Sequence, residues 1–179
     1  MRKVLLFALV GALALSAGIY TAVQREDSAL EKANAALGDL VGQPRPPWTL
    51  GAADGRRVSA HEFDGDVVLL NFWATWCAPC RAEMPMLVEV QRDYADRGFE
   101  VIGIALDDVQ QARDFADELG VDYTILVGGA DVMAAGVAYG NAAGMLPYSV
   151  LIDRDGIVRW TVLGELHRDD LAQRLEPLL

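Results

Sequence analysis

The stretch NFWATWCAPCR, residues 71–81, is the most informative part of this chain. It continues the apolar run VVLL of residues 67–70 and precedes a segment with helical spacing, so it lies where a buried strand passes into a helix N-terminus. Cys77 and Cys80 are the only cysteines, and a spacing of three places both sulfurs on one side of a first helical turn. The pair can therefore close and open a short disulfide loop with little change of backbone.

The position of the two cysteines predicts redox chemistry. Unpaired N–H groups and the helix macrodipole favour the thiolate at Cys77, and the thiolate is the nucleophile of disulfide exchange. Cys80 lies deeper in the helix, where it could attack a mixed disulfide on Cys77 and release the partner. Pro79 suits the first turn because its missing N–H would have no partner there.

Two other interpretations of the cysteine pair are weaker. A permanent structural disulfide across so short a loop would remove little chain entropy. A zinc site would need two more ligands, and the sequence offers only His61 and His167, which are far apart and more typical of surface or capping positions. We therefore predict a redox-active pair and no metal site.

Residues 72–85, FWATWCAPCRAEMP, carry a resemblance to a known family. They resemble the active-site signature of the thioredoxin superfamily and, within it, of the membrane-anchored TlpA/ResA/CcmG-type reductases outside the cytoplasm. The resemblance implies a thioredoxin-like α/β fold, with a central mixed sheet, helices on both faces and an N-terminal β-hairpin extension. It implies no cofactor other than the Cys77–Cys80 disulfide, disulfide-bearing protein substrates, and a membrane thiol donor that renews the electrons. Substrates in the family include apocytochrome c and copper-site cysteines of oxidase assembly, and both kinds stay open here.

Three further residues are predicted to contact the substrate. In the superfamily the proline equivalent to Pro147 is cis and faces the disulfide, so the resemblance implies a cis bond between Leu146 and Pro147. The backbone N–H and C=O of Leu146 would then be offered to an extended substrate segment. Trp76 is expected to form an exposed apolar platform beside Cys77, whereas Trp73 is expected in the core.

Glu83 is the third candidate catalytic residue, after the two cysteines. It follows Cys80 by one helical turn, and the reductive branch of the family carries a glutamate at this place. Partly buried, it would have a raised pKa and pass a proton to Cys80 when the mixed disulfide resolves. Thioredoxin has an aspartate where Asn71 stands, so Glu83 would supply the proton acceptor that is missing there. The alternative is an exposed helix glutamate paired with a nearby arginine.

The first 23 residues predict a membrane anchor. Arg2 and Lys3 precede an apolar run over residues 4–23, which at about 1.5 Å per residue spans roughly the 30 Å of a bilayer core. We predict one transmembrane helix over residues 1–23, a linker over 24–42 and a thioredoxin-like domain over 43–179. The protein would be a single-pass inner-membrane protein with its catalytic domain in the periplasm. A cleaved signal peptide that leaves a soluble periplasmic protein is the alternative.

The charge of the chain excludes one class of partner. The net charge is −11, and without residues 1–23 the remainder carries 13 basic against 26 acidic residues, a net charge of −13. Nucleic-acid binding proteins need the opposite balance, so no nucleic-acid partner is predicted.

Apolar runs and turn residues predict the order of elements in the domain. On the helix after Cys80, Met84, Leu87 and Val88 are expected to face the core and Gln91 to lie on a polar face. A hairpin over 48–59 should turn at 54–55. The other elements are strands over 66–72, 99–106, 123–127, 148–152 and 157–163, and helices from the cysteine pair to about 97, over 109–119 and 130–138, and from 169 or 170 onward.

Two rival functions would use the same cysteines. A copper(I)-handling carrier would use both sulfurs as soft ligands, although the sequence offers no third sulfur nearby. A peroxiredoxin-type peroxidase shares the fold, but its reactive cysteine normally has no CxxC partner. We therefore predict a thiol:disulfide oxidoreductase that reduces partner proteins.

Overall fold

The computed structural model describes residues 40–179. The predicted anchor over residues 1–23 and nearly all of the predicted linker over 24–42 lie outside the described residues. Within residues 40–179 no helix has the length and apolar character that a bilayer crossing needs.

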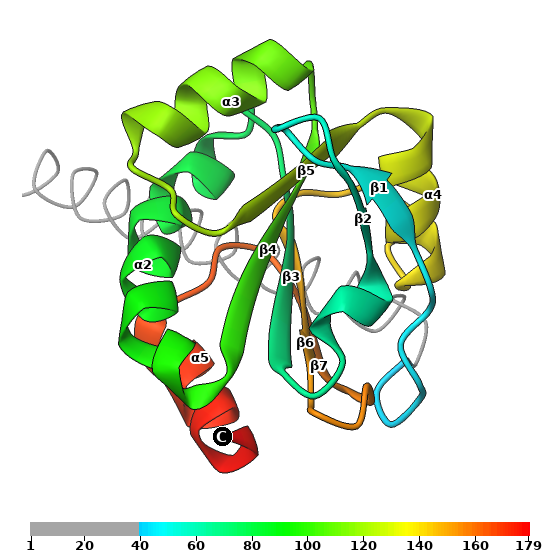
Figure 1. Cartoon of the computed structure of the whole chain (residues 1–179), viewed down its shortest axis with the longest axis vertical. Helices are drawn as coiled ribbons and strands as arrows, with labels where there is room; N and C mark the ends of the chain where they lie inside the picture. Colours follow the sequence, from blue (N-terminus) through cyan, green and yellow to red (C-terminus); the bar gives the residue numbers. More distant parts are fainter. Residues whose placement is uncertain (1–39) are drawn as a thin grey trace, which may run out of the picture. The chain divides into compact units, whose positions relative to one another are not determined.

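A five-stranded mixed sheet forms the centre of the domain (Figure 1). Its strand order is β5-β4-β3-β6-β7, so β3, the strand that leads to the cysteines, is the middle one. β3 pairs parallel with β4 and antiparallel with β6. The five strands are β3 (Val67–Trp73), β4 (Phe99–Leu106), β5 (Thr124–Gly128), β6 (Tyr148–Ile152) and β7 (Val158–Leu163). The predicted mixed sheet is confirmed, and each strand begins and ends within one residue of its expected bounds.

Within residues 40–179, four α-helices and three short 3-10 turns surround the sheet. α2 and α5 lie on one side of it and α4 on the other (Figure 1). The main buried cluster joins the sheet to α2, α3 and α5, whereas Gly136 of α4 lies against the ring of Phe72 on the opposite face. The helices are α2 (Ala78–Tyr94), α3 (Val109–Glu118), α4 (Ala130–Ala138) and α5 (Arg168–Leu175), and the 3-10 turns are η1 (Ala60–Phe63), η2 (Ala95–Arg97) and η3 (Glu176–Leu178).

The predicted N-terminal hairpin is also present. β1 (Thr49–Gly51) pairs antiparallel with β2 (Arg57–Ser59), with Leu50 opposite Val58 and both side chains buried. A bridge between Ala52 and Leu126 attaches the hairpin to the β5 edge of the sheet.

The ends of the helices follow local chemistry. Asp108 caps α3 by accepting hydrogen bonds from the backbone N–H groups of Gln110 and Gln111. Gly98 ends η2. Its φ of 72° is a left-handed conformation that glycine adopts without a side-chain clash. The last helix was expected from residue 169 or 170. It begins at Arg168, after His167, and places both aspartates in its first turn, where their charge favours the positive helix end.

The prediction for Gln91 was wrong. Its side chain is not on a polar face; the residue is 7% exposed. Its Oε1 accepts a hydrogen bond of 2.6 Å from the backbone N–H of Val101, and its Nε2 donates to Glu100 at 3.2 Å. The hydrogen bond from the Val101 N–H on β4 thus compensates for the burial of the Gln91 side chain, which helical spacing alone places in solvent.

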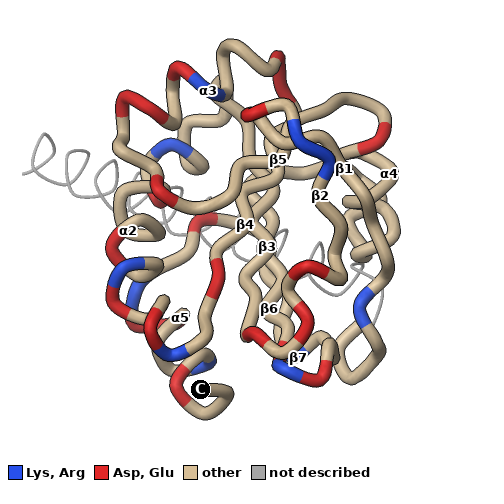
Figure 2. The backbone as a smooth tube through the Cα atoms, viewed as in Figure 1, with Lys and Arg blue, Asp and Glu red and all other residues tan. Residues whose placement is uncertain are grey.

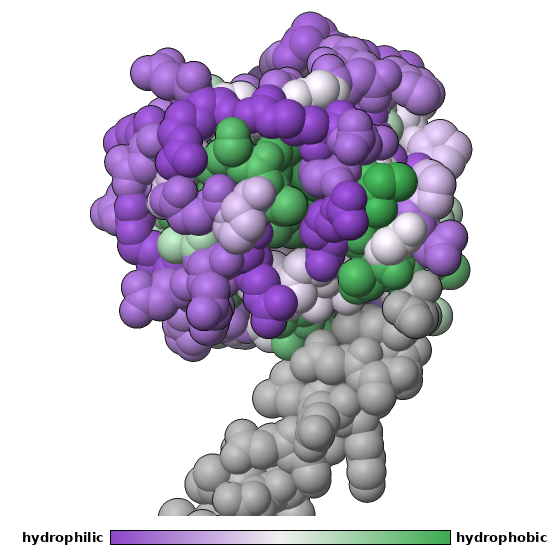
Figure 3. All heavy atoms as spheres, turned by 90° about the horizontal axis from the view of Figure 1, so that it is seen from below, coloured by the Kyte–Doolittle hydropathy of each residue, from purple (hydrophilic) through white to green (hydrophobic). Residues whose placement is uncertain are grey.

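Charged residues lie outside the centre of the sheet. Figure 2 shows acidic residues distributed over the helices and turns, while the central strands are almost free of charge. Figure 3 views the domain from the end at which the C-terminal helix lies, and there hydrophilic residues surround smaller apolar patches. The surface therefore agrees with the acidic balance of the sequence.

Candidate active site

The two cysteines lie at the N-terminus of α2, directly beyond the central strand. Cys77 is the N-cap of the helix, and its Sγ accepts a hydrogen bond of 3.3 Å from the backbone N–H of Cys80. The pair forms a disulfide, with a distance of 5.3 Å between the two Cα atoms. Cys77 is 6% exposed and Cys80 is fully buried. Cys77 is therefore the more accessible of the two cysteines, and Cys80 is shielded.

The loop that leads to Cys77 is fastened to the end of β4. Asp107 accepts two hydrogen bonds of 2.7 Å from Thr75, one from its backbone N–H and one from its hydroxyl. Both donors belong to the residue two positions before Cys77. The sequence gives no local signal of this contact, because Thr75 and Asp107 are 32 residues apart.

The two tryptophans of the signature lie in opposite environments, as expected. Trp76 is 68% exposed, beside Cys77 in the sequence. Trp73 is fully buried, and its ring packs on Phe115 with 5.8 Å between the ring centroids. Arg81 lies over the ring of Phe115, with its guanidinium carbon 5.4 Å from the centroid of that ring. Trp76 thus exposes its apolar ring to solvent, and Trp73 is part of the core.

Glu83 is buried one helical turn after Cys80 and is 1% exposed. Its Oε1 accepts a hydrogen bond of 2.7 Å from Asn71 Nδ2, and its Oε2 accepts one of 2.6 Å from the backbone N–H of Leu166. Burial raises the pKa of Glu83 to about 7, against the lowering effect of these two bonds and with a further rise from the charge of Glu165. The alternative of an exposed glutamate paired with an arginine is wrong.

Asn71 connects Glu83 to the opposite strand. Its Nδ2 also donates to Ser149 Oγ at 3.0 Å, because Asn71 on β3 and Ser149 on β6 are partners in the antiparallel register. Both residues are fully buried. Ser149 was missed in the sequence, where the signal was a single hydroxyl residue within the apolar strand YSVLI.

The Leu146–Pro147 peptide bond is cis, as the resemblance implied. Pro147 is buried and precedes β6, and its carbonyl accepts a hydrogen bond from the backbone N–H of Gly164. Asn141, also missed in the sequence, holds the preceding loop: its Nδ2 donates to the Met145 carbonyl at 2.8 Å and its Oδ1 accepts from the Met145 N–H at 3.0 Å. A buried asparagine thus shapes the loop that ends at Leu146.

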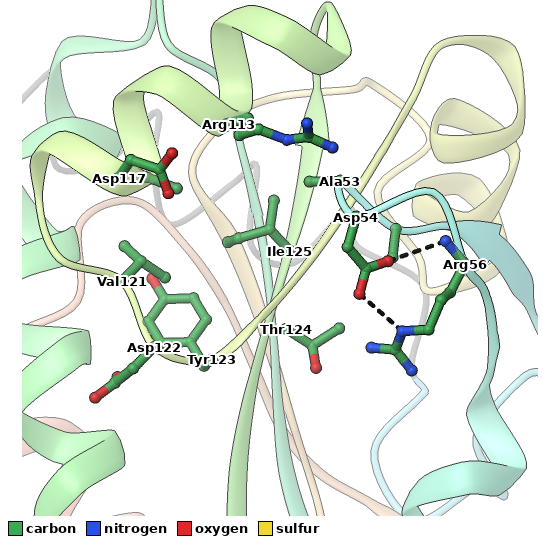
Figure 4. Close-up of a pocket in the computed structure, with 12 residues that line it drawn as sticks. Ala53, Asp54, Arg56, Arg113, Asp117, Val121, Asp122, Tyr123, Thr124 and Ile125 are labelled. Atoms are coloured by element: carbon green, nitrogen blue, oxygen red, sulfur yellow. Dashed lines mark hydrogen bonds and ion pairs between the residues drawn. The ribbon is translucent and has the colours of Figure 1, made fainter.

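Among the hollows of the described residues, two lie near the elements that hold the site, away from the cysteine pair. A small apolar one of about 90 Å³ separates α4 from the loop before Pro147, and Leu146 is part of its wall together with Phe72, Ile104 and Leu106. The second, of about 560 Å³, lies between the hairpin, α3 and the start of β5. Figure 4 shows that charged and apolar side chains share its wall, and that Asp54 accepts hydrogen bonds from the backbone and the side chain of Arg56. Neither cysteine lines either hollow.

Residues 40–179 contain no group of three or more His, Cys, Asp and Glu side chains that could hold a metal ion. His61 and His167 are both exposed, at the places expected for surface residues.

Comparison with known proteins agrees with this geometry. The chain is 31% identical to the thiol-disulfide oxidoreductase ResA of Geobacillus thermodenitrificans over 179 residues, which cover 99% of this chain and 94% of that protein. It is 31% identical to the thioredoxin-like protein YneN of Bacillus subtilis over 144 residues, 78% of this chain and 81% of that protein. A crystal structure of a thiol:disulfide interchange protein from Chlorobium tepidum superposes with a TM-score of 0.69 at 28% identity, covering 79% of this chain and 99% of that one. Because residues 41–161 match the AhpC/TSA family, the chain belongs to that family, as a thioredoxin-like thiol-disulfide oxidoreductase.

Proposed function

We propose that this oxidoreductase works as a reductase of partner proteins outside the cytoplasm, through the Cys77/Cys80 dithiol. The observation that carries the proposal is a buried acid one helical turn beyond the shielded cysteine, with a pKa of about 7. An acid of that pKa can both accept and release a proton near neutral pH, which is the requirement for exchanging a proton with a thiol.

The reduction of a partner takes two exchange steps. The Cys77 thiolate attacks one sulfur of the partner disulfide, a bond forms between the two sulfurs, and the second partner sulfur leaves with the electron pair and takes a proton from water. Ionised Glu83 then accepts the proton of the Cys80 thiol, and Cys80 attacks the sulfur of Cys77. The Cys77–Cys80 disulfide forms, and the first partner sulfur leaves as a thiolate. Two electrons have passed to the partner.

Renewal of the dithiol runs the same steps in reverse. A thiolate of the membrane donor attacks Cys77, and Cys80 leaves and takes the proton that Glu83 holds. A second thiolate of the donor then attacks the donor sulfur bound to Cys77, the donor disulfide forms, and Cys77 leaves as a thiolate. No cofactor other than the disulfide is needed, because thiols supply all the electrons. In this proposal Glu83 is reset once in every cycle.

Substrate contacts are assigned to the surface beside Cys77. Trp76 supplies exposed apolar area, and Leu146 and Pro147 close the loop that Asn141 shapes. The partly buried side chain of Leu146 also lines the small apolar hollow. An extended segment of the partner would pair with the backbone of Leu146 while its cysteine reaches Cys77.

Residues 1–23 support a location at the inner membrane, with the catalytic domain in the periplasm. The apolar run is long enough for one membrane span, and the basic residues before it favour an N-terminus inside. Apocytochrome c or copper-site proteins of oxidase assembly are the proposed classes of substrate.

The deciding experiment is the equilibrium potential of the Cys77/Cys80 pair in glutathione and dithiothreitol buffers. A potential near or below about −250 mV supports a reductase, whereas one near about −120 mV makes the protein a disulfide donor and overturns the proposed direction. Tight stoichiometric retention of copper(I), or rapid turnover driven by peroxide, would instead favour the carrier or the peroxidase.

A further inference from the structure

Only the nitrogen of the Asn71 carboxamide forms hydrogen bonds within residues 40–179. Its Nδ2 donates both to Glu83 Oε1 at 2.7 Å and to Ser149 Oγ at 3.0 Å. The other end, Oδ1, is buried and has no hydrogen-bond partner within residues 40–179. An unpaired buried acceptor costs free energy, so an asparagine that leaves one in the core needs an explanation.

The two partners of Nδ2 share a chemical property. The carboxyl of Glu83 only accepts hydrogen bonds while it is ionised, but it donates one when it is protonated. The hydroxyl of Ser149 accepts or donates, according to how it is turned. Both partners can therefore change from acceptor to donor without moving their oxygen atoms.

A carboxamide can follow that change. Rotation of the Asn71 side chain by about 180° around its Cβ–Cγ bond exchanges Oδ1 and Nδ2, and an amide oxygen has two lone pairs. Oδ1 would then accept from the Glu83 O–H and from the Ser149 O–H in the places where Nδ2 donates now. An aspartate at position 71 could not donate to the ionised form, and a leucine could bind neither form.

We propose that Asn71 is a positioning residue for Glu83, and that its carboxamide rotates whenever Glu83 gains or loses a proton. The carboxyl then keeps one position in both states, and each proton exchanged with Cys80 starts from the same geometry. The inference rests on the proposed function in that Glu83 is the group that exchanges the proton.

The groups that face Glu83 come from several elements. Glu165 lies after β7 and its charge raises the pKa of Glu83, which is about 7, while the backbone N–H of Leu166 and the amide of Asn71 lower it. The hydroxyl of Tyr123, before β5, is buried; this burial and, to a smaller extent, the charge of Glu83 raise its pKa, so it stays neutral. The cysteines at the start of α2 do not titrate while they form the disulfide. Both states of Glu83 are thus populated near neutral pH.

The test is an NMR titration of the oxidised full-length chain in detergent micelles between pH 5 and 9. The ¹³C signal of the Glu83 carboxyl gives its protonation midpoint, and the two Nδ2 proton signals of Asn71 report their acceptors. If the carboxamide rotates, both Nδ2 protons lose their acceptors together and move upfield below the midpoint of Glu83. If only the proton that faces Glu83 moves, or neither does, the amide is fixed and the proposal is overturned. A Glu83 midpoint near its ordinary value would overturn it as well.

Ser149→Ala assigns the two signals. It removes one acceptor at every pH, so the Nδ2 proton that faces position 149 should lie upfield throughout, while the other should still follow Glu83. If that second proton no longer follows Glu83, rotation does not depend on the protonation of Glu83.

Asn71→Leu measures the net effect of the amide. A hydrogen bond to the ionised carboxylate is roughly twice as strong as a neutral one, so the midpoint of Glu83 should rise by about one pH unit. An unchanged midpoint would contradict the positioning role. Gln91→Leu is the matched control: it removes another buried carboxamide, on α2 itself, and it should leave the midpoint of Glu83 unchanged.

These measurements need neither a partner nor electron transfer. A potential that made the protein a disulfide donor would overturn the proposed direction and leave the titration unchanged. Should a variant not fold, the two proton signals of the unchanged chain still decide the question.

Discussion

The carboxylate of Glu83 accepts a hydrogen bond of 2.6 Å from the backbone N–H of Leu166, 83 residues later in the chain. Leu166 lies between β7 and α5 and is 3% exposed. One carboxylate oxygen is thus held by the main chain of the C-terminal part, and the other by the side chain of Asn71. Because both donors favour the ionised form, the high pKa of Glu83 is an effect of burial that prevails over two opposing bonds.

Glu83→Gln should slow resolution of the mixed disulfide. The amide has nearly the same shape but cannot accept the proton of Cys80, so we expect a loss of about 10²-fold or more in rate, and no inflection near pH 7. Stopped-flow mixing of the reduced protein with a disulfide substrate between pH 5 and 9 measures both effects. Glu89→Gln is the matched control on α2, since its side chain is 69% exposed and pairs with Arg168. A wild-type pH profile in Glu83→Gln would contradict the assigned role.

Protonation of Glu83 should make the stability of the oxidised protein depend on pH. Its pKa is about 7 in the folded state and 4.5 as its ordinary value, so the folded state binds the proton more tightly. The contribution to stability is complete below the ordinary value and is lost as pH rises through the folded value, in total about 3 kcal/mol.

The measurement is urea unfolding at several pH values between 4 and 9. The difference in unfolding free energy between the wild type and Glu83→Gln should change by that amount in favour of the variant as pH increases. A difference that is constant over this range would show that Glu83 has an ordinary pKa in the folded state.

Substitution of Trp76 should affect the binding of a partner protein, whereas substitution of Trp73 should affect the stability of the fold. Trp76→Ala is expected to change the unfolding free energy by no more than about 0.5 kcal/mol, because most of the side chain is in solvent. It should raise KM for a protein disulfide but not for a small disulfide such as oxidised glutathione. Trp73→Ala should cost about 3–5 kcal/mol, because it empties a fully buried site. Equal effects of Trp76→Ala on both substrates would exclude it as a docking surface.

The roles of the two sulfurs predict an asymmetric trapping result. Cys80→Ser should accumulate a mixed disulfide between Cys77 and the partner, since the buried residue that releases the partner is gone. Non-reducing electrophoresis and mass spectrometry detect this complex. Cys77→Ser should trap nothing, because Cys80 is fully buried. Trapping through Cys80 would reverse the assignment.

Much of the fold could be predicted because it depends on local patterns. Continuous apolar runs in the sequence predicted β3, β4 and β6. The cysteine pair identified the position of the site for the same reason, since strand, cysteines and helix are consecutive in the chain.

The missing parts of the site depend on pairing between distant segments. Ser149 meets Asn71 only through the register of β3 with β6, and Leu166 meets Glu83 only after the last helix has packed. The error at Gln91 has the same origin, because its partner is a strand amide that helical periodicity does not represent. Hydrophobic periodicity of two or 3.6 residues identifies strands and helices, but it does not show which side chains form hydrogen bonds between distant segments.

The bonds from Thr75 to Asp107 have a consequence for electron transfer itself. They tie the approach to Cys77 to the end of a central strand, in a loop that already carries the helix cap. Because these bonds restrain the backbone before Cys77, we expect the structures of the oxidised and reduced proteins to be nearly superposable. The two redox states would then differ in where their protons are rather than in shape, and a partner would distinguish them by charge.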